Sequence, residues 1–154
     1  MAESYGASSG YVSAPESLVR PLTEADVPWL RQLCLKRYSS RFDSYTTERW
    51  FVEICLKKPL IFYSVRTDDA FLIALLNTVP WLPAEMECNV IFLCAEPGKI
   101  WQTVALCRAS IEWGKLRRAT IWRLASDTDY DLAPIARRVG AKEIHPRWCV
   151  EWKP

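Results

Sequence analysis

The chain has 154 residues, of which half are hydrophobic and a quarter are charged, and this composition indicates one folded domain rather than a disordered chain. Twenty Lys and Arg residues against eighteen Asp and Glu residues leave a formal net charge of +2. This charge is too small to indicate a surface for duplex nucleic acid. The longest apolar runs, 70–76 and 90–95, are far shorter than a membrane-spanning helix, so we expect no membrane partner.

The first 17 residues are rich in Gly, Ser and Ala and lack hydrophobic periodicity. This composition is typical of an N-terminal arm that is flexible or is ordered by a partner, and it predicts a domain over residues 18–154. The arm has neither the basic start nor the apolar segment of a secretory signal, so we expect a cytoplasmic location.

The six cysteines are dispersed along the chain without a C-x-x-C pair, and the sequence contains a single histidine, His145. A zinc site needs clustered thiolate and imidazole ligands, so we expect no metal. Each cysteine instead lies in an apolar pattern that predicts a buried free thiol. The six are Cys34, Cys55, Cys88, Cys94, Cys107 and Cys149.

The first half of the chain predicts a short strand at 18–22 and a helix that begins after the N-cap signal at 23–26 and extends to about Tyr38. A second helix is predicted from residue 46 to the basic pair before Pro59. Segments 60–66 and 70–79 then predict a hairpin around the turn at Asp68 and Asp69.

The second half predicts a strongly apolar strand at 87–95 and a long helix from about residue 100 to residue 118. A strand at 119–125, a short helix from 130 or 131 to 139 and a final alternating strand at 147–152 complete the order. An antiparallel meander followed by strand–helix–strand units predicts an α/β fold. We therefore expect a mixed central sheet of about six strands flanked by four helices on its two faces.

Three stretches occur in the order and spacing of a known family: LVRPLTEADVPWLRQLC, ASIEWGKLRRATIWRLA and DLAPIARRVGAKEI. They resemble the first strand and helix, the end of the cofactor helix with the next strand, and the following helix of the GNAT superfamily of acyl-CoA-dependent N-acyltransferases. The resemblance covers about residues 18–154. It implies the GNAT fold and transfer of an acetyl group from acetyl-CoA to the amine of a small molecule or a protein.

The resemblance also implies a cofactor site at the start of the long helix, where free N–H groups meet the pyrophosphate. The family's glycine-rich signature is reduced here to one glycine, and Glu96 adds a carboxylate beside the expected phosphate position. Lys99 and the N–H groups of Lys99, Ile100 and Trp101 supply what is left of the cradle. The cofactor-binding residues that we expect are Cys94, Gly98, Lys99, Ile100 and Trp101.

The family's proton donor is a tyrosine four residues before the glycine that closes the next helix. That position is Ala136 in this sequence, so Tyr130 at the start of the helix is the substitute candidate. Glu85 and Glu87 precede or begin the fourth strand, and either one is a candidate base for the acceptor amine.

The loss of these motif residues supports a second hypothesis, a non-catalytic GNAT-fold structural or assembly subunit. A phage virion component is one such setting, with location in the virion. The 17-residue arm and surplus tryptophans, Trp81 and Trp101 foremost, would then contact a protein partner or a second copy of the chain.

Overall fold

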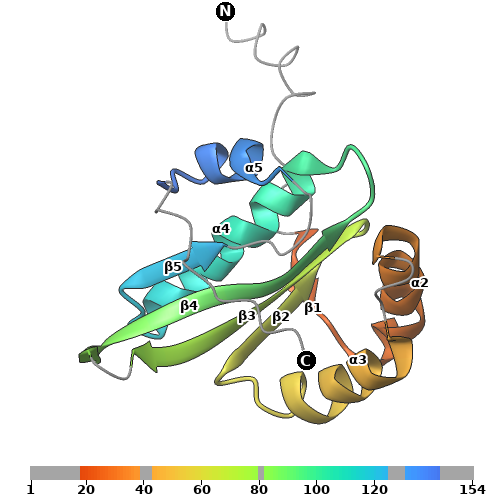
Figure 1. Ribbon diagram of the computed structural model, residues 1–154, viewed down its shortest axis with the longest axis horizontal. Coiled ribbons are helices and arrows are strands. Elements are labelled where there is room, and N and C mark those ends of the chain that lie inside the picture. The colour runs from red at the N-terminus through yellow and green to blue at the C-terminus, as the bar shows by residue number, and fades with distance from the viewer. Residues whose placement is uncertain (1–17, 39–42, 80–81, 125–130, 143–154) are drawn as a thin grey trace, which may run out of the picture.

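The computed structural model of the chain describes residues 18–38, 43–79, 82–124 and 131–142 (Figure 1). The elements follow the predicted order, and helices cover both faces of a mixed sheet. The predicted strand at 147–152 lies outside the described residues, as do the candidate residues Trp81, Tyr130, His145 and Cys149.

The five described strands lie in the order in which they occur along the chain. Strands β1 to β4 pair antiparallel, whereas β5 returns through a helix and pairs parallel with β4. The mixed sheet is confirmed, and its fourth strand begins at Leu82, five residues before the predicted start. The strands are β1 (Arg20–Pro21), β2 (Phe62–Arg66), β3 (Ala70–Val79), β4 (Leu82–Ala95) and β5 (Ile121–Leu124).

Helices α2 (Val27–Tyr38) and α3 (Ser44–Trp50) cover one face of the sheet, and α3 continues as a π-helical turn over Phe51–Cys55. Helices α4 (Ile100–Leu116) and α5 (Ala133–Arg138) lie on the opposite face. The four predicted helices are therefore confirmed. None of the helices in the described part of the chain is long and apolar enough to cross a membrane.

The sheet separates two hydrophobic cores, because β3 is buried on both of its faces. Phe71 and Ile73 pack toward α2 and α3, while Leu72 and Ala74 pack in the core that includes Leu106 of α4. This alternation explains why 70–79 is apolar at nearly every position.

Helix α4 lies unusually close to β4. A Cβ atom added to Gly114 would lie 3.0 Å from Cys88 Cβ, so only a residue without a side chain allows this approach. Ser110, also fully buried on α4, accepts a hydrogen bond from Trp122 Nε1 of β5 (2.9 Å). These contacts fix α4 against both strands that border the candidate site.

The described cysteines are buried free thiols, as the sequence predicts. Burial raises the pKa of Cys55 and of Cys107 to about 12, so both thiols are protonated at neutral pH. They behave as small hydrophobic side chains of the two cores.

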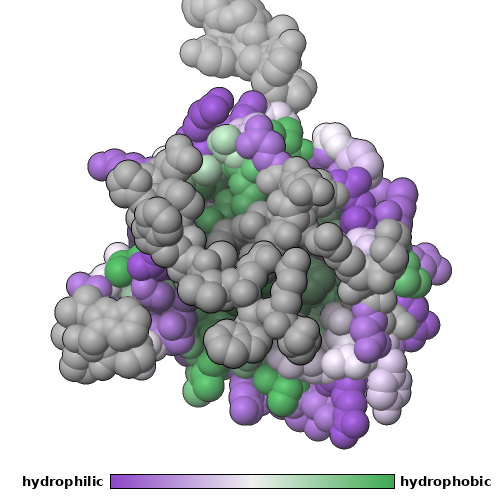
Figure 2. Space-filling view, in the orientation of Figure 1, coloured by the Kyte–Doolittle hydropathy of each residue, from purple (hydrophilic) through white to green (hydrophobic). Residues whose placement is uncertain are grey.

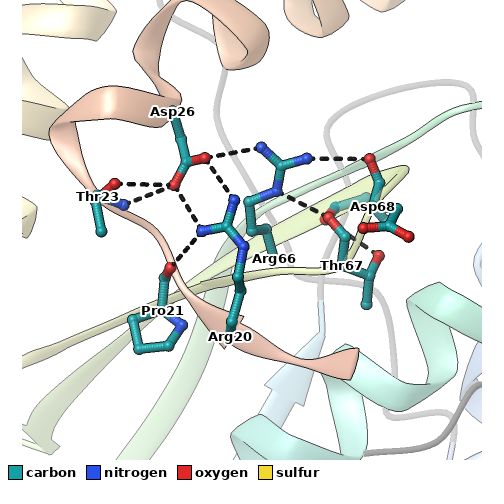
Figure 3. A network of polar contacts seen from close by, with 8 residues as sticks. Arg20, Pro21, Thr23, Asp26, Arg66, Thr67 and Asp68 are labelled. Atoms are coloured by element: carbon teal, nitrogen blue, oxygen red, sulfur yellow. Dashed lines mark hydrogen bonds and ion pairs between the residues drawn. The ribbon is translucent and has the colours of Figure 1, made fainter. Parts of the chain in front are cut away.

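A buried carboxylate, Asp26, joins the start of α2 to the β2–β3 hairpin (Figure 3). It accepts two hydrogen bonds from Arg20 (2.7 and 3.0 Å) and one from Arg66 Nη1 (2.9 Å). The same carboxylate caps the first turn by accepting from the N–H of Thr23 (2.9 Å). Arg66 in turn lies over the Trp29 ring, with 3.3 Å from Cζ to the ring centroid.

The hydrogen bonds from Arg20, together with the N–H of Thr23 and the charge of Arg66, hold the pKa of Asp26 well below its usual range. Arg66 also donates to the Thr67 and Asp68 carbonyls (2.9 and 3.1 Å). Its buried charge therefore depends on one carboxylate and two carbonyl groups, which position the hairpin turn.

Replacing Asp26 by Asn keeps the size of the side chain and removes the charge that compensates Arg66. We expect the free energy of unfolding at pH 7 to fall by about 3 kcal/mol, because a buried charge loses its partner. The folded-state pKa of Asp26 is depressed, so its contribution is complete above about pH 4 and is lost as the pH falls through that pKa. Urea unfolding at pH 7 and pH 3 measures both effects.

Glu53→Gln is the matched control, since Glu53 pairs with Arg49 on an exposed helix surface. We expect this variant to change the free energy of unfolding by less than about 0.5 kcal/mol. An Asp26→Asn protein as stable as the wild type at pH 7 would contradict the assigned role of the network.

Candidate functional site

Strands β4 and β5 pair over only a short part of β4. The pairs run from Glu87 with Ile121 to Val90 with Leu124, whereas β4 continues to Ala95. Among the described residues, nothing pairs with β4 on this side beyond Val90. We call this side of β4, from Ile91 to Ala95, the open edge, because no strand in the described part of the chain lies beside it.

A one-residue bulge lies where the pairing stops. Ile73 of β3 pairs with Phe92 and Ala74 pairs with Val90, so Ile91 is the extra residue in β4. Ile91 is also one of the exposed large hydrophobic residues, at 41% of its accessible area.

The bulge changes which main-chain groups point away from β3. Before the bulge, the Met86 carbonyl accepts a hydrogen bond from the Thr120 N–H, which precedes β5 (2.9 Å). Main-chain groups alternate in direction along a strand, so those of Cys88 and Val90 point to β5 as well. After the bulge, the Glu96 N–H donates to the Asp69 carbonyl (2.8 Å), so the main-chain groups of Glu96 point toward the β3 side. Alternation then directs the N–H and C=O groups of Leu93 and Ala95 to the open edge.

Helix α4 begins five residues after the end of β4. Lys99 is its N-cap residue and makes no side-chain cap hydrogen bond. The first three helical N–H groups, those of Ile100, Trp101 and Gln102, have no partner within the helix, and a positive partial charge accumulates there. The expected N–H of Lys99 is not part of this set, because it donates to the Glu96 carbonyl (3.4 Å).

Gly98 precedes this helix with a φ of +78°, a conformation that favours glycine. A Cβ atom added at Gly98 would meet no heavy atom within 4 Å. The main chain beside the α4 N-terminus is therefore open to close approach.

Side chains beside the α4 N-terminus bind one another. The Lys99 ammonium lies 3.2 Å from Asp69 Oδ2, and Lys36 Nζ lies 2.7 Å from Glu96 Oε2. Gln102 accepts from the Asp69 N–H (3.0 Å) and donates to the Asp69 carboxylate (3.0 Å), which fixes α4 to the β2–β3 turn. Hydrogen bonds from Gln102 and Lys99 lower the pKa of Asp69, so the carboxylate is charged.

Glu87, one of the two predicted bases, lies buried on β4 next to β5. Its Oε1 accepts from Arg123 Nε and Nη2, both at 2.8 Å, and Oε2 accepts from Asn89 (3.3 Å). Asn89 also donates to Asn77 of β3. The guanidinium and the carboxylate form a charge-assisted pair. Glu85, the other candidate, is half-buried on β4 without an ion pair to any described residue.

The structure brings Gly98, Lys99, Ile100 and Trp101 together at the α4 N-terminus. The Cys94 side chain points elsewhere, into the core on the α2 face. Trp101 is half-buried and lies under the Arg138 guanidinium of α5 (5.0 Å from Cζ to the ring centroid).

Ala136 lies half-buried on α5, while Tyr130, its suggested substitute, is outside the described residues. Within the described ranges, no group of three His, Cys, Asp or Glu side chains is arranged to hold a metal ion.

Three residues at this site carry no signal in the sequence. Ile91 lies in an uninterrupted apolar run, so alternation does not show that it is an extra residue. The role of Gln102 depends on a turn 33 residues away. Tyr38 fits the apolar stripe of α2, yet its hydroxyl donates to the Leu93 carbonyl (3.2 Å) at the open edge of β4.

No family model matches the sequence, and no curated protein matches it. Solved structures do match the fold. An integron cassette protein from the mobile metagenome of Cole Harbour Salt Marsh superposes with a TM-score of 0.73 at 15% identity, covering 90% of this chain and 92% of that one. A putative acetyltransferase from Agrobacterium tumefaciens gives 0.69 at 14% identity, covering 87% and 99%.

A third similar structure is AAC(6')-Iy in complex with the bisubstrate analogue CoA-S-monomethyl-acetylneamine. It superposes with a TM-score of 0.66 at 13% identity, covering 88% of this chain and 97% of that one. At these identities the likeness shows the fold alone. The chain has a GNAT-like mixed α/β fold.

Proposed function

We propose that the protein is an acetyl-CoA-dependent N-acetyltransferase that acts by direct attack of an amine on the thioester. The observation that carries the proposal is the open edge of β4 beyond Val90, which leads from the bulge at Ile91 toward the N-terminus of α4. An extended acyl-pantetheine presents amide groups that pair with such an edge as an added strand does. When bound, acetyl-CoA supplies an activated carbonyl carbon and a thiolate leaving group.

The residues of this chain fit the cosubstrate mainly through main-chain groups. Leu93 and Ala95 offer N–H and C=O groups along the edge, and the first three N–H groups of α4 are free within the helix. Open space at Gly98 leaves room for phosphate oxygens to approach them.

The side chains at the α4 N-terminus fit a pyrophosphate less well. Lys99 is paired with Asp69, and Glu96 adds a second carboxylate beside the same helix terminus. Recognition of the phosphates therefore rests on helix N–H groups more than on a free cation. We expect weaker cosubstrate binding than a glycine-rich loop with an unpaired cation would give.

We assign the general base to Glu87. Arg123 holds it as a carboxylate, the state that removes a proton from an ammonium acceptor directly or through water. Nitrogen then attacks the thioester carbon and the C–S bond breaks. The nitrogen loses its second proton as the amide forms, and this loss balances the proton that the CoA thiolate takes up. Ala136 has no proton to deliver, so solvent or another side chain serves as donor.

A second candidate function is a non-catalytic binding or assembly role, which the paired Lys99 and Ala136 favour. In that case the described tryptophans offer a partner only part of their surface, because all five are half-buried: Trp29, Trp50, Trp101, Trp113 and Trp122. Hydrophilic side chains make up most of the described surface in Figure 2, with small hydrophobic areas between them. The most exposed large hydrophobic residues are Leu116, Tyr45 and Leu60.

Calorimetric titration with acetyl-CoA separates the two candidates, and a glycine pair sharpens the test. Gly98 and Gly140 have nearly equal φ values, +78° and +76°, and both would carry a Cβ in open space. Gly98→Ala and Gly140→Ala therefore introduce the same backbone strain, about 1 kcal/mol. We expect Gly98→Ala alone to weaken acetyl-CoA binding, by about tenfold, because only Gly98 adjoins the α4 N-terminus.

An equal loss of acetyl-CoA affinity in the two variants would show that backbone strain acts through the stability of the fold, and it would contradict a specific role of Gly98 in binding. No binding to wild-type protein at millimolar acetyl-CoA would exclude the transferase and leave the assembly role. Deletion of residues 1–17 then tests that role, since unchanged self-association or partner binding would exclude the arm as the contact.

Glu87→Gln tests the proposed base. We expect kcat for acetyl transfer to an amine to fall at least about 100-fold, because the amide cannot take up the proton, with the Kd for acetyl-CoA unchanged. Initial rates of CoA release with a panel of small amines and peptide amines measure this effect. Glu53→Gln is the control on an exposed carboxylate. A Glu87→Gln protein with wild-type kcat would exclude Glu87 as the base.

A further inference from the structure

Tyr38, the last residue of α2, reaches the open edge of β4 from the face opposite α4. Its ring packs edge-on against Phe92, with 5.7 Å between ring centroids. The hydroxyl donates to the Leu93 carbonyl at 3.2 Å. These two contacts set the ring orientation and place a side-chain hydroxyl among the main-chain groups of the edge.

The Leu93 carbonyl is one of the groups that the bulge directs away from β3. The Leu93 side chain packs in the α4 core, and the main chain of the neighbouring residues Phe92 and Cys94 points to β3. The Tyr38 hydroxyl therefore lies beside the edge that an extended ligand would pair with, between the bulge and the α4 N-terminus.

The chemical state of the hydroxyl limits what it can do. Burial raises the pKa of Tyr38. The phenol is neutral across the physiological range, so it donates a hydrogen bond and does not act as a base. The adjacent Cys34 thiol is protonated too, because its hydrogen bond with Cys94 and its burial raise its pKa.

We infer that Tyr38 is a binding residue for the acyl-pantetheine arm of the cosubstrate. In the free protein the Tyr38 hydroxyl donates its hydrogen bond to the Leu93 carbonyl. In the complex the hydroxyl donates to a carbonyl oxygen of the ligand, and the Leu93 carbonyl accepts an amide N–H of the ligand instead. This assignment rests on the proposed acetyl-CoA site and adds to it a residue from α2.

The test compares acetyl-CoA with adenosine 3′,5′-bisphosphate, which keeps the 3′-phosphorylated adenosine and one phosphate of the pyrophosphate and lacks the pantetheine arm. Tyr38→Phe removes one hydroxyl and keeps the ring that packs on Phe92. We expect its Kd for acetyl-CoA to rise about five- to tenfold, the effect of one neutral hydrogen bond, with the Kd for the bisphosphate unchanged. Tyr45→Phe is the matched control, because Tyr45 is 73% exposed on α3.

The two probes separate the possible outcomes. Wild-type affinity of Tyr38→Phe for acetyl-CoA would overturn the role of Tyr38 and leave the proposed function intact. An equal loss for both probes would show an effect through folding and would also overturn it. Wild-type protein that binds neither probe would overturn the proposed function, and the inference with it. Retained bisphosphate binding by the variant shows that its site is folded.

Discussion

One extra residue in β4, Ile91, determines which main-chain groups of the strand point away from β3. Before Ile91 the outward main-chain groups of β4 pair with β5, whereas after it no described strand lies beside the outward groups of Leu93 and Ala95. Among the described residues, the bulge marks the point where β4 changes from an internal strand to an edge.

An edge inside a fold persists only if the surrounding elements are held independently of it. Asp26 and Arg66 fix the start of α2 to the β2–β3 hairpin, and Gln102 fixes the same hairpin to α4. On the other side, Gly114 and Ser110 hold α4 against β4 and β5. The open edge beyond Val90 thus lies between elements that polar networks and close packing hold in place.

The order of elements could be predicted from the sequence because each element has a local signal. The capping box at Thr23 and Asp26, the turn at Asp68 and the apolar stripe of α4 are such signals. The bulge could not be predicted, because residues 90–95 are apolar on both faces and a one-residue slip leaves that pattern unchanged. Pairings such as Glu87 with Arg123, 36 residues apart, depend on strand order and register and have no local signature.

The reduced glycine signature and the retained geometry need not contradict each other. Glycines in such a loop allow phosphate oxygens to come close, while the binding groups themselves are backbone N–H groups that any residue except proline supplies. Gly98 keeps the one position where φ is +78°, and Ile100, Trp101 and Gln102 keep the N–H groups. The side chains around this helix terminus change its charge and its accessibility. Asp69 neutralises the charge of Lys99, and Trp101 is larger than the small residue that the family signature has. In the proposed acetyl-CoA site, these side chains therefore lower the affinity for the ligand and leave the main-chain N–H groups in place.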